Sequence, residues 1–433
     1  MNLCIRMCGE LNGEVWVGGD KSITHRSLIL GAIADGETII HNYSHAEDCL
    51  STVRCLKSMG IEIDVSKEWI TIKGRGLYGL KEPEDVLDCG NSGTTIRLLA
   101  GLLAGQKFYS VLTGDDSLRK RPMKRVVEPL KLMGAEITSR NNCFAPLSMV
   151  GKKLKGIEYR LPVASAQVKS ALMLAGLYAD SNMILEEPVP TRDHTERLFE
   201  FFGLKFTNNG KKITVFPAQG FSGRIINIPN DISSAAFFVV LGLLTAREMV
   251  IKDTGVNPLR CGIIEILRQN GADIKFDKQR GLNNEPVANI IVKRSEIFPF
   301  TISGSLIPRL IDEIPVLAVL ATQLKGISEI KDAKELRVKE TDRISAICSE
   351  LRRMGANIEE TEDGMIIKGP TRLKGAACES YNDHRIAMSL AIAGLVAEGE
   401  TIIKGADCIN ISFPEFINIL KGVCGEECVQ YQE

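Results

Sequence analysis

One short pattern recurs along the chain and constrains the fold more than any other feature. A helix-like stretch ends at a glycine, and a short apolar strand begins directly after it. Glycine suits the position just past a helix, where a left-handed backbone ends the helix at little steric cost. Copies occupy residues 56–63, 130–137, 201–206, 267–274 and 351–358, with a degraded copy at 420–425. At this period of roughly 70 residues, too long for the common solenoid repeats, six α/β units fit the chain.

A second pattern alternates with the first. The sequence Ala-Asp-Gly-Glu-Thr-Ile-Ile at residues 34–40 returns as Ala-Glu-Gly-Glu-Thr-Ile-Ile at residues 397–403. Each copy follows a helical run that is apolar on all sides, which is typical of a buried helix. We therefore predict an α/β fold of two domains with three units each. Turn-rich seams predict an inserted domain at residues 20–230 and an outer, discontinuous domain at residues 1–19 plus 231–433.

Composition excludes several classes of protein. Hydrophobic residues make up 44% and charged residues 25%, which is the balance of an ordinary globular protein. The net charge of −1 provides no overall field for nucleic acid or an anionic membrane, so an anionic ligand must meet a local cluster of Lys and Arg. We expect no signal peptide and no membrane span. The twelve cysteines lack zinc-site spacing, so we expect a cytoplasmic protein with reduced thiols, no metal and no cofactor.

Lys21, Ser22 and Arg26 open a predicted helix directly after the first seam, with Ser22 as its expected cap. The free N–H groups of a helix start, together with two cations, predict an anion site. A bound anion would also relieve the conflict between a cation in the first turn and the helix dipole. The alternative is a solvated helix cap with no ligand.

A glycine-rich segment and a run of cations follow in the same domain. In residues 88–97, Gly90 and Gly93 allow close backbone approach, and Asn91 or Ser92 can cap the next helix. The segment resembles a phosphate cradle, but the lysine spacing of a P-loop is missing. A plain glycine-rich helix start is the alternative. Residues 119–125 contain five cations, most of which we expect in solvent. Arg121 is the best candidate among them for a bidentate grip on a carboxylate or phosphate.

Two further polar segments stand before helices of the inserted domain. Ser165 and Gln167 lie two residues apart just before an apolar helix, so both can donate to one anion. A simple capping turn is the alternative. Arg192, within Thr-Arg-Asp-His at residues 191–194, either supplies another cation or belongs only to a helix start.

The outer domain has three densely charged helix starts. Asp312 and Glu313 head a very apolar helix, residues 337–343 pack five charges and one threonine, and residues 381–386 precede another apolar run. Surface charge is the ordinary explanation, but charges beside buried helices usually pair or bind something. Carboxylates and cations together are what acid–base catalysis on an anionic substrate requires.

These segments resemble those of one enzyme family, the bacterial 5-enolpyruvylshikimate-3-phosphate synthases, over essentially the whole chain. The most specific matches are Gly-Asn-Ser-Gly-Thr at residues 90–94, Leu-Arg-Val-Lys-Glu-Thr-Asp-Arg at 336–343 and Asn-Asp-His-Arg-Ile-Ala-Met at 382–388. The resemblance implies an inside-out α/β barrel in each domain, built from three βαβαββ repeats. It also implies a cytoplasmic, monomeric transferase of the shikimate pathway, in aromatic amino-acid and chorismate biosynthesis.

The resemblance also implies a set of site residues. Contacts to shikimate 3-phosphate are implied for Lys21, Ser22, Arg26, Ser165, Gln167, Arg192, Asp312 and Lys339. Contacts to phosphoenolpyruvate are implied for Lys21, Gly93, Arg121, Gln167, Arg343 and Arg385. The implied catalytic residues are Asp312, Glu340, Lys21 and His384.

Five positions depart from the family pattern and favour its second subclass. Ala166 replaces a second serine, Arg192 replaces a tyrosine, and Glu335 replaces an asparagine that binds shikimate in some members. Ile411 replaces a lysine that binds phosphoenolpyruvate, and Leu98 replaces a proline after the glycine-rich loop. The resemblance does not say what compensates for the missing lysine.

For the mechanism, we hypothesise that Glu340 is the acid that protonates C3 of phosphoenolpyruvate. Asp312 is the candidate base for the attacking hydroxyl, or at least the group that orients it. The two carboxyl groups must hold opposite protonation states at one pH, so their environments must differ. Three alternatives are weaker. A UDP-N-acetylglucosamine enolpyruvyl transferase would carry a cysteine at residues 113–125, where this chain has none. An RNA 3′-phosphate cyclase would need a basic surface, and a non-catalytic scaffold would not need so many charged helix starts.

Overall fold

The protein was analysed as a computed structural model, which describes residues 1–432. The chain divides into two compact units. Unit 1 contains Met1–Gly18, Pro229–Gly281 and the chain from Pro286 onward, whereas unit 2 contains Gly19–Ile228 and the short segment Leu282–Glu285. Each unit has a hydrophobic core of its own. The chain therefore passes between the units at residues 18–19 and 228–229, and again on each side of residues 282–285.

Six four-stranded sheets, three in each unit, share one arrangement. A first strand pairs in parallel with a second, the second pairs antiparallel with a third, and the third pairs antiparallel with a fourth. In unit 2, the strand order of one sheet is β14 (Ile225–Asn227), β3 (Asp35–His41), β5 (Trp69–Arg75) and β4 (Glu62–Val65). The order of the second sheet is β6 (Leu87–Asp88), β7 (Tyr109–Thr113), β9 (Phe144–Val150) and β8 (Glu136–Arg140). The order of the third sheet is β10 (Glu158–Arg160), β11 (Met183–Glu186), β13 (Lys212–Val215) and β12 (Phe206–Asn208).

The sheets of unit 1 repeat this order of strands. The first sheet contains β2 (Leu11–Val15), β15 (Ala246–Gly255), β17 (Glu285–Lys293) and β16 (Asp273–Leu282). The second contains β18 (Thr301–Ile302), β19 (Gly326–Ile330), β21 (Met365–Gly369) and β20 (Asn357–Glu360). The third contains β22 (Ala377–Glu379), β23 (Glu400–Lys404), β1 (Asn2–Arg6) and β24 (Val429–Gln432). The N-terminal strand β1 lies inside the last sheet, between β23 and β24. This pairing closes the third repeat of unit 1 with the start of the chain.

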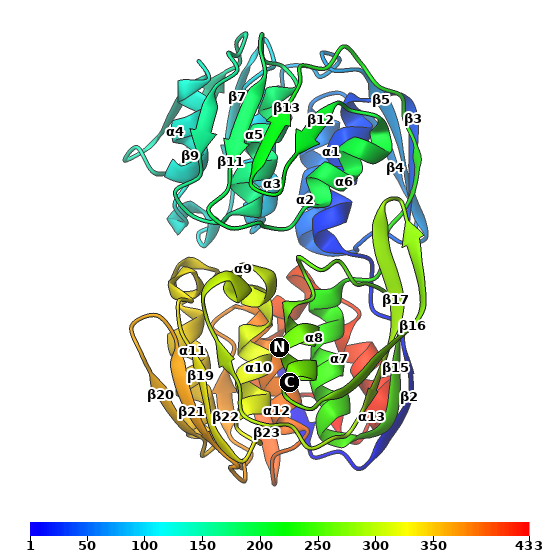
Figure 1. Ribbon diagram of the computed structural model, residues 1–433, viewed down its shortest axis with the longest axis vertical. Helices are drawn as coiled ribbons and strands as arrows, with labels where there is room; N and C mark the ends of the chain where they lie inside the picture. The colour runs from blue at the N-terminus through cyan, green and yellow to red at the C-terminus, as the bar shows by residue number, and fades with distance from the viewer. Residues whose placement is uncertain (433) are drawn as a thin grey trace. The chain divides into compact units, whose positions relative to one another are not determined.

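Each repeat contributes one buried helix to the centre of its unit and a second, amphipathic helix nearby (Figure 1). The buried helices are α1 (Lys21–Ile33), α3 (Gly93–Leu103) and α5 (Ala166–Gly176) in unit 2, and α7 (Ile232–Thr245), α10 (Ile314–Ala321) and α12 (His384–Gly394) in unit 1. The second set is α2 (Glu47–Ser58), α4 (Lys124–Leu132) and α6 (His194–Phe202), then α8 (Gly262–Gln269), α11 (Arg343–Arg353) and α13 (Phe416–Cys424). A short helix, α9 (Ile307–Leu310), precedes α10.

Helices lie inside each unit and sheets outside, so the predicted α/β fold of repeated units is confirmed. The glycines after the repeated helices behave as predicted, because Gly60, Gly134, Gly203, Gly271 and Gly355 all have positive φ angles. The degraded copy differs: its first glycine lies within α13, and the helix ends one turn later at a glycine with φ of 92°.

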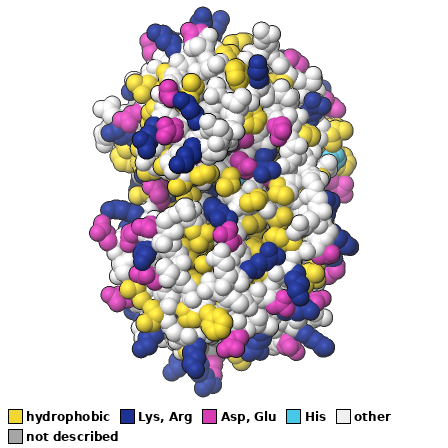
Figure 2. Space-filling view, in the orientation of Figure 1, with side chains coloured by type: hydrophobic (Ala, Val, Ile, Leu, Met, Phe, Trp, Pro, Cys, Tyr) yellow, Lys and Arg dark blue, Asp and Glu magenta, His cyan; other side chains and the backbone are white. Residues whose placement is uncertain are grey.

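The surface and the cysteines agree with the composition. Basic and acidic side chains are interspersed over the face that Figure 2 shows. The twelve cysteines are free thiols and ten of them are buried. No helix within residues 1–432 is both long enough and apolar enough to cross a membrane.

Candidate active site

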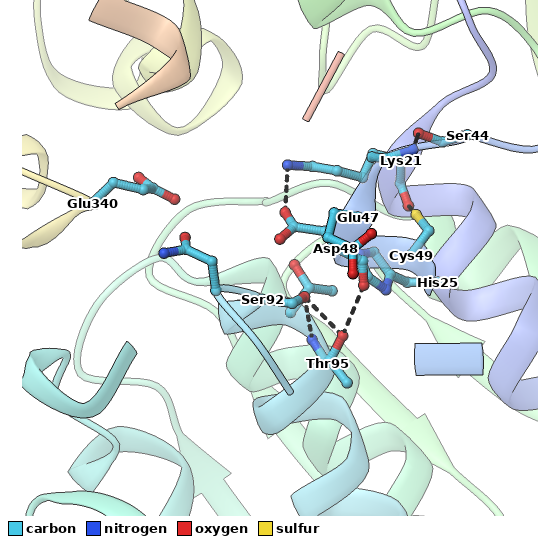
Figure 3. Close-up of polar contacts among 12 residues, drawn as sticks. Lys21, His25, Ser44, Glu47, Asp48, Cys49, Ser92, Thr95 and Glu340 are labelled. Carbon is cyan, nitrogen blue, oxygen red and sulfur yellow. Dashed lines mark hydrogen bonds and ion pairs between the residues drawn. The ribbon is translucent and has the colours of Figure 1, made fainter. Parts of the chain in front are cut away.

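The start of helix α1 differs from its predicted form. The cap is Asp20, whose side chain accepts a hydrogen bond from the Ile23 N–H at 2.8 Å, so the prediction of Ser22 as the cap is wrong. A carboxylate at this position also suits the helix dipole. Lys21 is the first residue of the helix, and its Nζ lies 2.8 Å from Asp48 Oδ2 on α2 (Figure 3). This ion pair offsets the conflict between a cation and the helix start.

Arg26 lies one turn further along α1 and is almost completely buried. Its guanidinium donates to the Ser22 carbonyl at 2.7 Å, to Thr195 Oγ1 at 2.8 Å and to Ser170 Oγ at 2.7 Å. Two of these hydrogen bonds tie α1 to α5 and α6, and the third lies within α1. Arg26 thus joins α1 to two helices whose contact residues lie 144 and 169 positions away in the sequence.

The glycine-rich segment forms the start of α3, as predicted. Ser92 is the cap and accepts a hydrogen bond from the Thr95 N–H at 3.1 Å (Figure 3). A methyl group added at Gly93 would lie 2.7 Å from Arg97 Nη1 and 3.4 Å from Arg121 Nη1. Two guanidinium groups therefore lie close to the backbone of Gly93. Such a concentration of donors beside a helix start is what an anion site requires.

The run of cations divides as predicted. Its exposed members include Lys120 and Lys124, whereas Arg121 is buried. Arg121 follows a short 3-10 helix, Leu118–Lys120, and donates to Asn91 Oδ1 at 2.7 Å and to Ser117 Oγ at 3.0 Å. These contacts hold the guanidinium beside the glycine-rich segment.

Helix α5 begins at the cap Ser165, whose side chain accepts from the Val168 N–H. Gln167 lies in its first turn, and its Oε1 accepts a 2.6 Å hydrogen bond from Arg97. The Gln167 amide donates to Thr94 Oγ1 at 3.0 Å. Gln167 is thereby joined to the start of α3. Arg97 was not among the predicted site residues, although it ends the glycine-rich segment, and the structure adds it to this group.

The start of α11 in unit 1 contains a buried cation among carboxylates. Arg343 is 2% exposed. Its side-chain nitrogens lie 2.8 Å from Asp383 Oδ2, 2.6 Å from Glu340 Oε2 and 3.4 Å from Asp312 Oδ1. Burial acts to lower the pKa of Arg343, but the three carboxylates outweigh it and raise that pKa. Lys339 Nζ, 3.3 Å from Asp312 Oδ1, adds a second cation to the cluster.

The start of α12 joins the same cluster. Asp383 is its cap and accepts from the Arg385 N–H at 2.8 Å, while His384 is the first helical residue and is buried. The Arg385 guanidinium donates to the Ser233 carbonyl at 3.0 Å and stacks on Phe237. The sequence motif contained Asp383 but gave no reason to count it as a site residue; its contact with Arg343 does.

Other charged residues of the predicted motifs are engaged elsewhere. Arg337 pairs with Asp342 and Glu360, at 2.7 and 2.9 Å, and is not part of the Arg343 cluster. Ile411, where some relatives of the implied family carry lysine, packs against the core of unit 1. Arg192 lies between β11 and α6, partly buried, in unit 2.

The predicted residues thus form two groups, one in each unit. The unit 2 group comprises Lys21, Ser22, Arg26, Gly93, Arg121, Ser165, Gln167 and Arg192, with Arg97 and Asp48 added by the structure. The unit 1 group comprises Asp312, Lys339, Glu340, Arg343, His384 and Arg385, with Asp383 added. The first group supplies hydrogen-bond donors and cations for anions, and the second supplies carboxylates held by cations. Together they have the composition of an enzyme that performs acid–base chemistry on phosphorylated substrates.

Comparison with known proteins identifies the family. The family model described as EPSP synthase (3-phosphoshikimate 1-carboxyvinyltransferase) matches residues 5–420. A 3-phosphoshikimate 1-carboxyvinyltransferase of Thermoanaerobacter sp. is 55% identical over 417 residues, covering 96% of this chain and 98% of that protein. One of Desulforudis audaxviator is 53% identical over 426 residues, covering 98% of this chain and 99% of that protein. A solved structure of EPSP synthase from Acinetobacter baumannii has a TM-score of 0.88 at 41% identity and covers both chains fully.

The chain belongs to the EPSP synthase family. The resemblance drawn from the sequence motifs is therefore confirmed, and with it the enzyme class, an enolpyruvyl transferase. The alternative of a UDP-N-acetylglucosamine enolpyruvyl transferase is not favoured.

Proposed function

We propose that this protein transfers the enolpyruvyl group of phosphoenolpyruvate to the 5-hydroxyl of shikimate 3-phosphate and releases phosphate. The observation that carries the proposal is the cluster around Arg343, in which one buried guanidinium holds Asp312 and Glu340 together. These are the two carboxylates that the mechanism needs as base and acid. Family membership supports the same substrates.

The addition step requires two proton movements. The oxygen of the 5-hydroxyl attacks C2 of phosphoenolpyruvate and gives its proton to Asp312, while Glu340 delivers a proton to C3. The vinyl carbon is a poor electrophile until C3 is protonated, so the acid is essential. The tetrahedral intermediate then loses one proton of its C3 methyl group, which Glu340 takes back, and phosphate, which leaves with the proton that Asp312 had received. Arg343 contacts both carboxylates, whereas Lys339 pairs with Asp312 at 3.3 Å, so the two carboxyl groups have different surroundings, as a base and an acid in one site require.

The unit 2 group binds the anions in this proposal. Arg121 and the Gly93 backbone receive phosphoenolpyruvate, and Gln167 contacts both substrates. Shikimate 3-phosphate is bound by Ser22, Arg26, Ser165 and Arg192 from this group, and by Asp312 and Lys339 from the other. Lys21 contacts both substrates and stands with His384, Asp312 and Glu340 in the catalytic set. Arg343 and Arg385 complete the contacts to phosphoenolpyruvate, and preorganised cations of this kind usually supply the largest share of rate enhancement.

The direct test is a phosphate-release assay with the purified protein. We expect release only when shikimate 3-phosphate and phosphoenolpyruvate are both present, and none when UDP-N-acetylglucosamine replaces the shikimate. Calorimetry with each acceptor alone should show binding of shikimate 3-phosphate only. Release with the UDP-sugar, or without any acceptor, would contradict the proposed function.

A further inference from the structure

Helix α5 contains a lysine to which neither the motifs nor the proposed mechanism gives a role. Lys169 lies one turn after the cap Ser165, and its side chain is 1% exposed. Lysine is almost never fully buried in proteins unless its ammonium group is paired. The partners of this ammonium therefore show what the residue does.

Three oxygen atoms surround the Lys169 ammonium. Nζ donates to Glu187 Oε2 at 3.1 Å and to the Thr191 carbonyl at 3.2 Å. It also lies 2.7 Å from Glu196 Oε1 as an ion pair. Both carboxylates are buried. All three partners belong to one stretch of chain, residues 187–196, which contains Arg192.

Residues on both sides of Arg192 make buried polar contacts. The residue before it, Thr191, donates its N–H and its hydroxyl to Glu187 Oε1, while its carbonyl accepts from Lys169. Two residues after it, His194 Nδ1 lies 2.6 Å from Glu285 Oε1, and both side chains are buried. The backbone at Arg192 is therefore held between two buried polar anchors, and Lys169 joins the first of them to the start of α5.

Stability alone does not explain a buried cluster of one cation and two carboxylates. The desolvation cost of such a cluster often exceeds its Coulombic gain, and apolar residues of similar volume frequently stabilise a fold better. What an apolar side chain cannot do is fix the Thr191 carbonyl at a defined distance from the first turn of α5. The cluster does this through directional contacts.

We propose that Lys169 is a positioning residue: by holding Thr191, it places the Arg192 guanidinium in register with Ser165 and Gln167 for binding of shikimate 3-phosphate. The proposal rests on the role given to Arg192 under the proposed function. Lys169 itself touches no substrate.

The test is steady-state kinetics of Lys169→Met with each substrate varied in turn. The thioether chain fills the same space but cannot bind Thr191 or Glu187. We expect the KM for shikimate 3-phosphate to rise about tenfold, because a misplaced hydrogen bond to a charged group weakens binding by about this factor. The KM for phosphoenolpyruvate and kcat should change less than about twofold. Equal increases in both KM values, or no increase, would overturn the proposal.

A matched pair of variants separates positioning from general loss of structure. Glu196→Gln leaves the contacts of Lys169 with Thr191 and Glu187 in place, so its KM values should stay at wild-type levels. Glu187→Gln weakens the acceptor for Thr191 and should reproduce the selective rise in KM, and it replaces Lys169→Met should that variant not fold. A selective rise in Glu196→Gln, or none in Glu187→Gln, would contradict the assignment.

A double-mutant cycle with Arg192→Ala tests whether Lys169 acts on substrate binding through Arg192. If Lys169 acts through Arg192, Lys169→Met should raise the KM for shikimate 3-phosphate no further in the Arg192→Ala background. A full additional rise would overturn the positioning role while leaving Arg192 as a binding residue. No effect of Arg192→Ala alone would instead remove Arg192 from the binding site, and the phosphate-release assay would still report independently on the proposed reaction.

Discussion

The two groups of candidate residues differ in how their charges are arranged. In the unit 1 group, three carboxylates surround the buried Arg343, so each charge is held by an opposite charge. In the unit 2 group, cations and neutral donors gather around the start of α3, and Asp48 is paired with Lys21. The difference fits a division of work within the proposed function: both carboxylates proposed to exchange protons belong to unit 1, whereas most residues proposed to bind anions belong to unit 2. Changes at Asp312 or Glu340 should therefore lower kcat, and changes around the start of α3 should raise KM.

The largest effect is expected for Arg343→Met. Removing this guanidinium leaves three carboxylates together without their buried cation, which should destabilise the fold by about 3–5 kcal/mol and abolish measurable phosphate release. Urea unfolding and the phosphate assay measure the two effects. Arg337→Met is the matched control, because it lies in the same motif but pairs with Asp342 and Glu360 outside the cluster. That variant should lose only about 1–2 kcal/mol and keep most of its activity.

The next largest effect is expected for Glu340→Gln, which should lower kcat. The amide keeps the size of the side chain and can still contact Arg343, but it cannot deliver a proton to C3. Loss of a general acid typically costs about 10²–10⁴-fold in rate, whereas the KM values should change little. Asp312→Asn should give a drop of the same order by removing the base. Undiminished kcat in both variants would refute the assignment of proton transfer to unit 1.

Gly93→Ala tests the unit 2 side of the comparison. The new methyl group would lie 2.7 Å from Arg97 Nη1, so that guanidinium must move, and Arg121 lies close behind it. We expect the KM for phosphoenolpyruvate to rise about tenfold, as for a misplaced charged hydrogen bond, with less change in the KM for shikimate 3-phosphate. Gly9→Ala is the control, because nothing lies within 4 Å of the added atom. A drop in kcat alone would contradict the division of work.

Much of the fold could be predicted because its signals are local and repeated. A glycine directly after a helix, such as Gly60 or Gly134, predicts the left-handed backbone conformation that the structure shows there. The period of the copies predicts the number of units. For α3 the sequence offered Asn91 and Ser92 as caps, and Ser92 is the cap in the structure. The cap of α1 was assigned wrongly because Asp20 and Ser22 compete within three residues, and only backbone geometry decides between them.

The missed residues share a different property: their partners are distant in the sequence. Arg97 meets Gln167 across 70 residues, and Lys21 meets Asp48 on another helix. Lys169 looked like one polar residue in an apolar helix, because its carboxylate partners lie beyond the next strand. Motifs reveal the residues that are close in sequence, but the pairing of buried charges depends on how the repeats pack.

The smallest expected effect concerns the pH dependence of stability at Glu196. Burial raises its pKa, with Asp193 adding to the rise and Lys169 opposing it. A carboxyl group with a higher pKa in the folded state binds its proton more tightly there, so its contribution to stability is greatest below the unfolded-state pKa of about 4.3 and is lost as pH rises through the folded-state pKa. Glu196→Gln removes this dependence.

We therefore expect the stability of the wild type, relative to Glu196→Gln, to fall as the pH rises above about 4.3. Urea unfolding of both proteins at a series of pH values measures the difference. A difference that stays constant would show that the carboxylate is charged throughout this range, held by Lys169. A difference that grows in favour of the wild type as pH rises would show that the ion pair outweighs desolvation. Either result would show that Glu196 is held as a charged carboxylate by Lys169, as the carboxylates of the unit 1 group are held by Arg343.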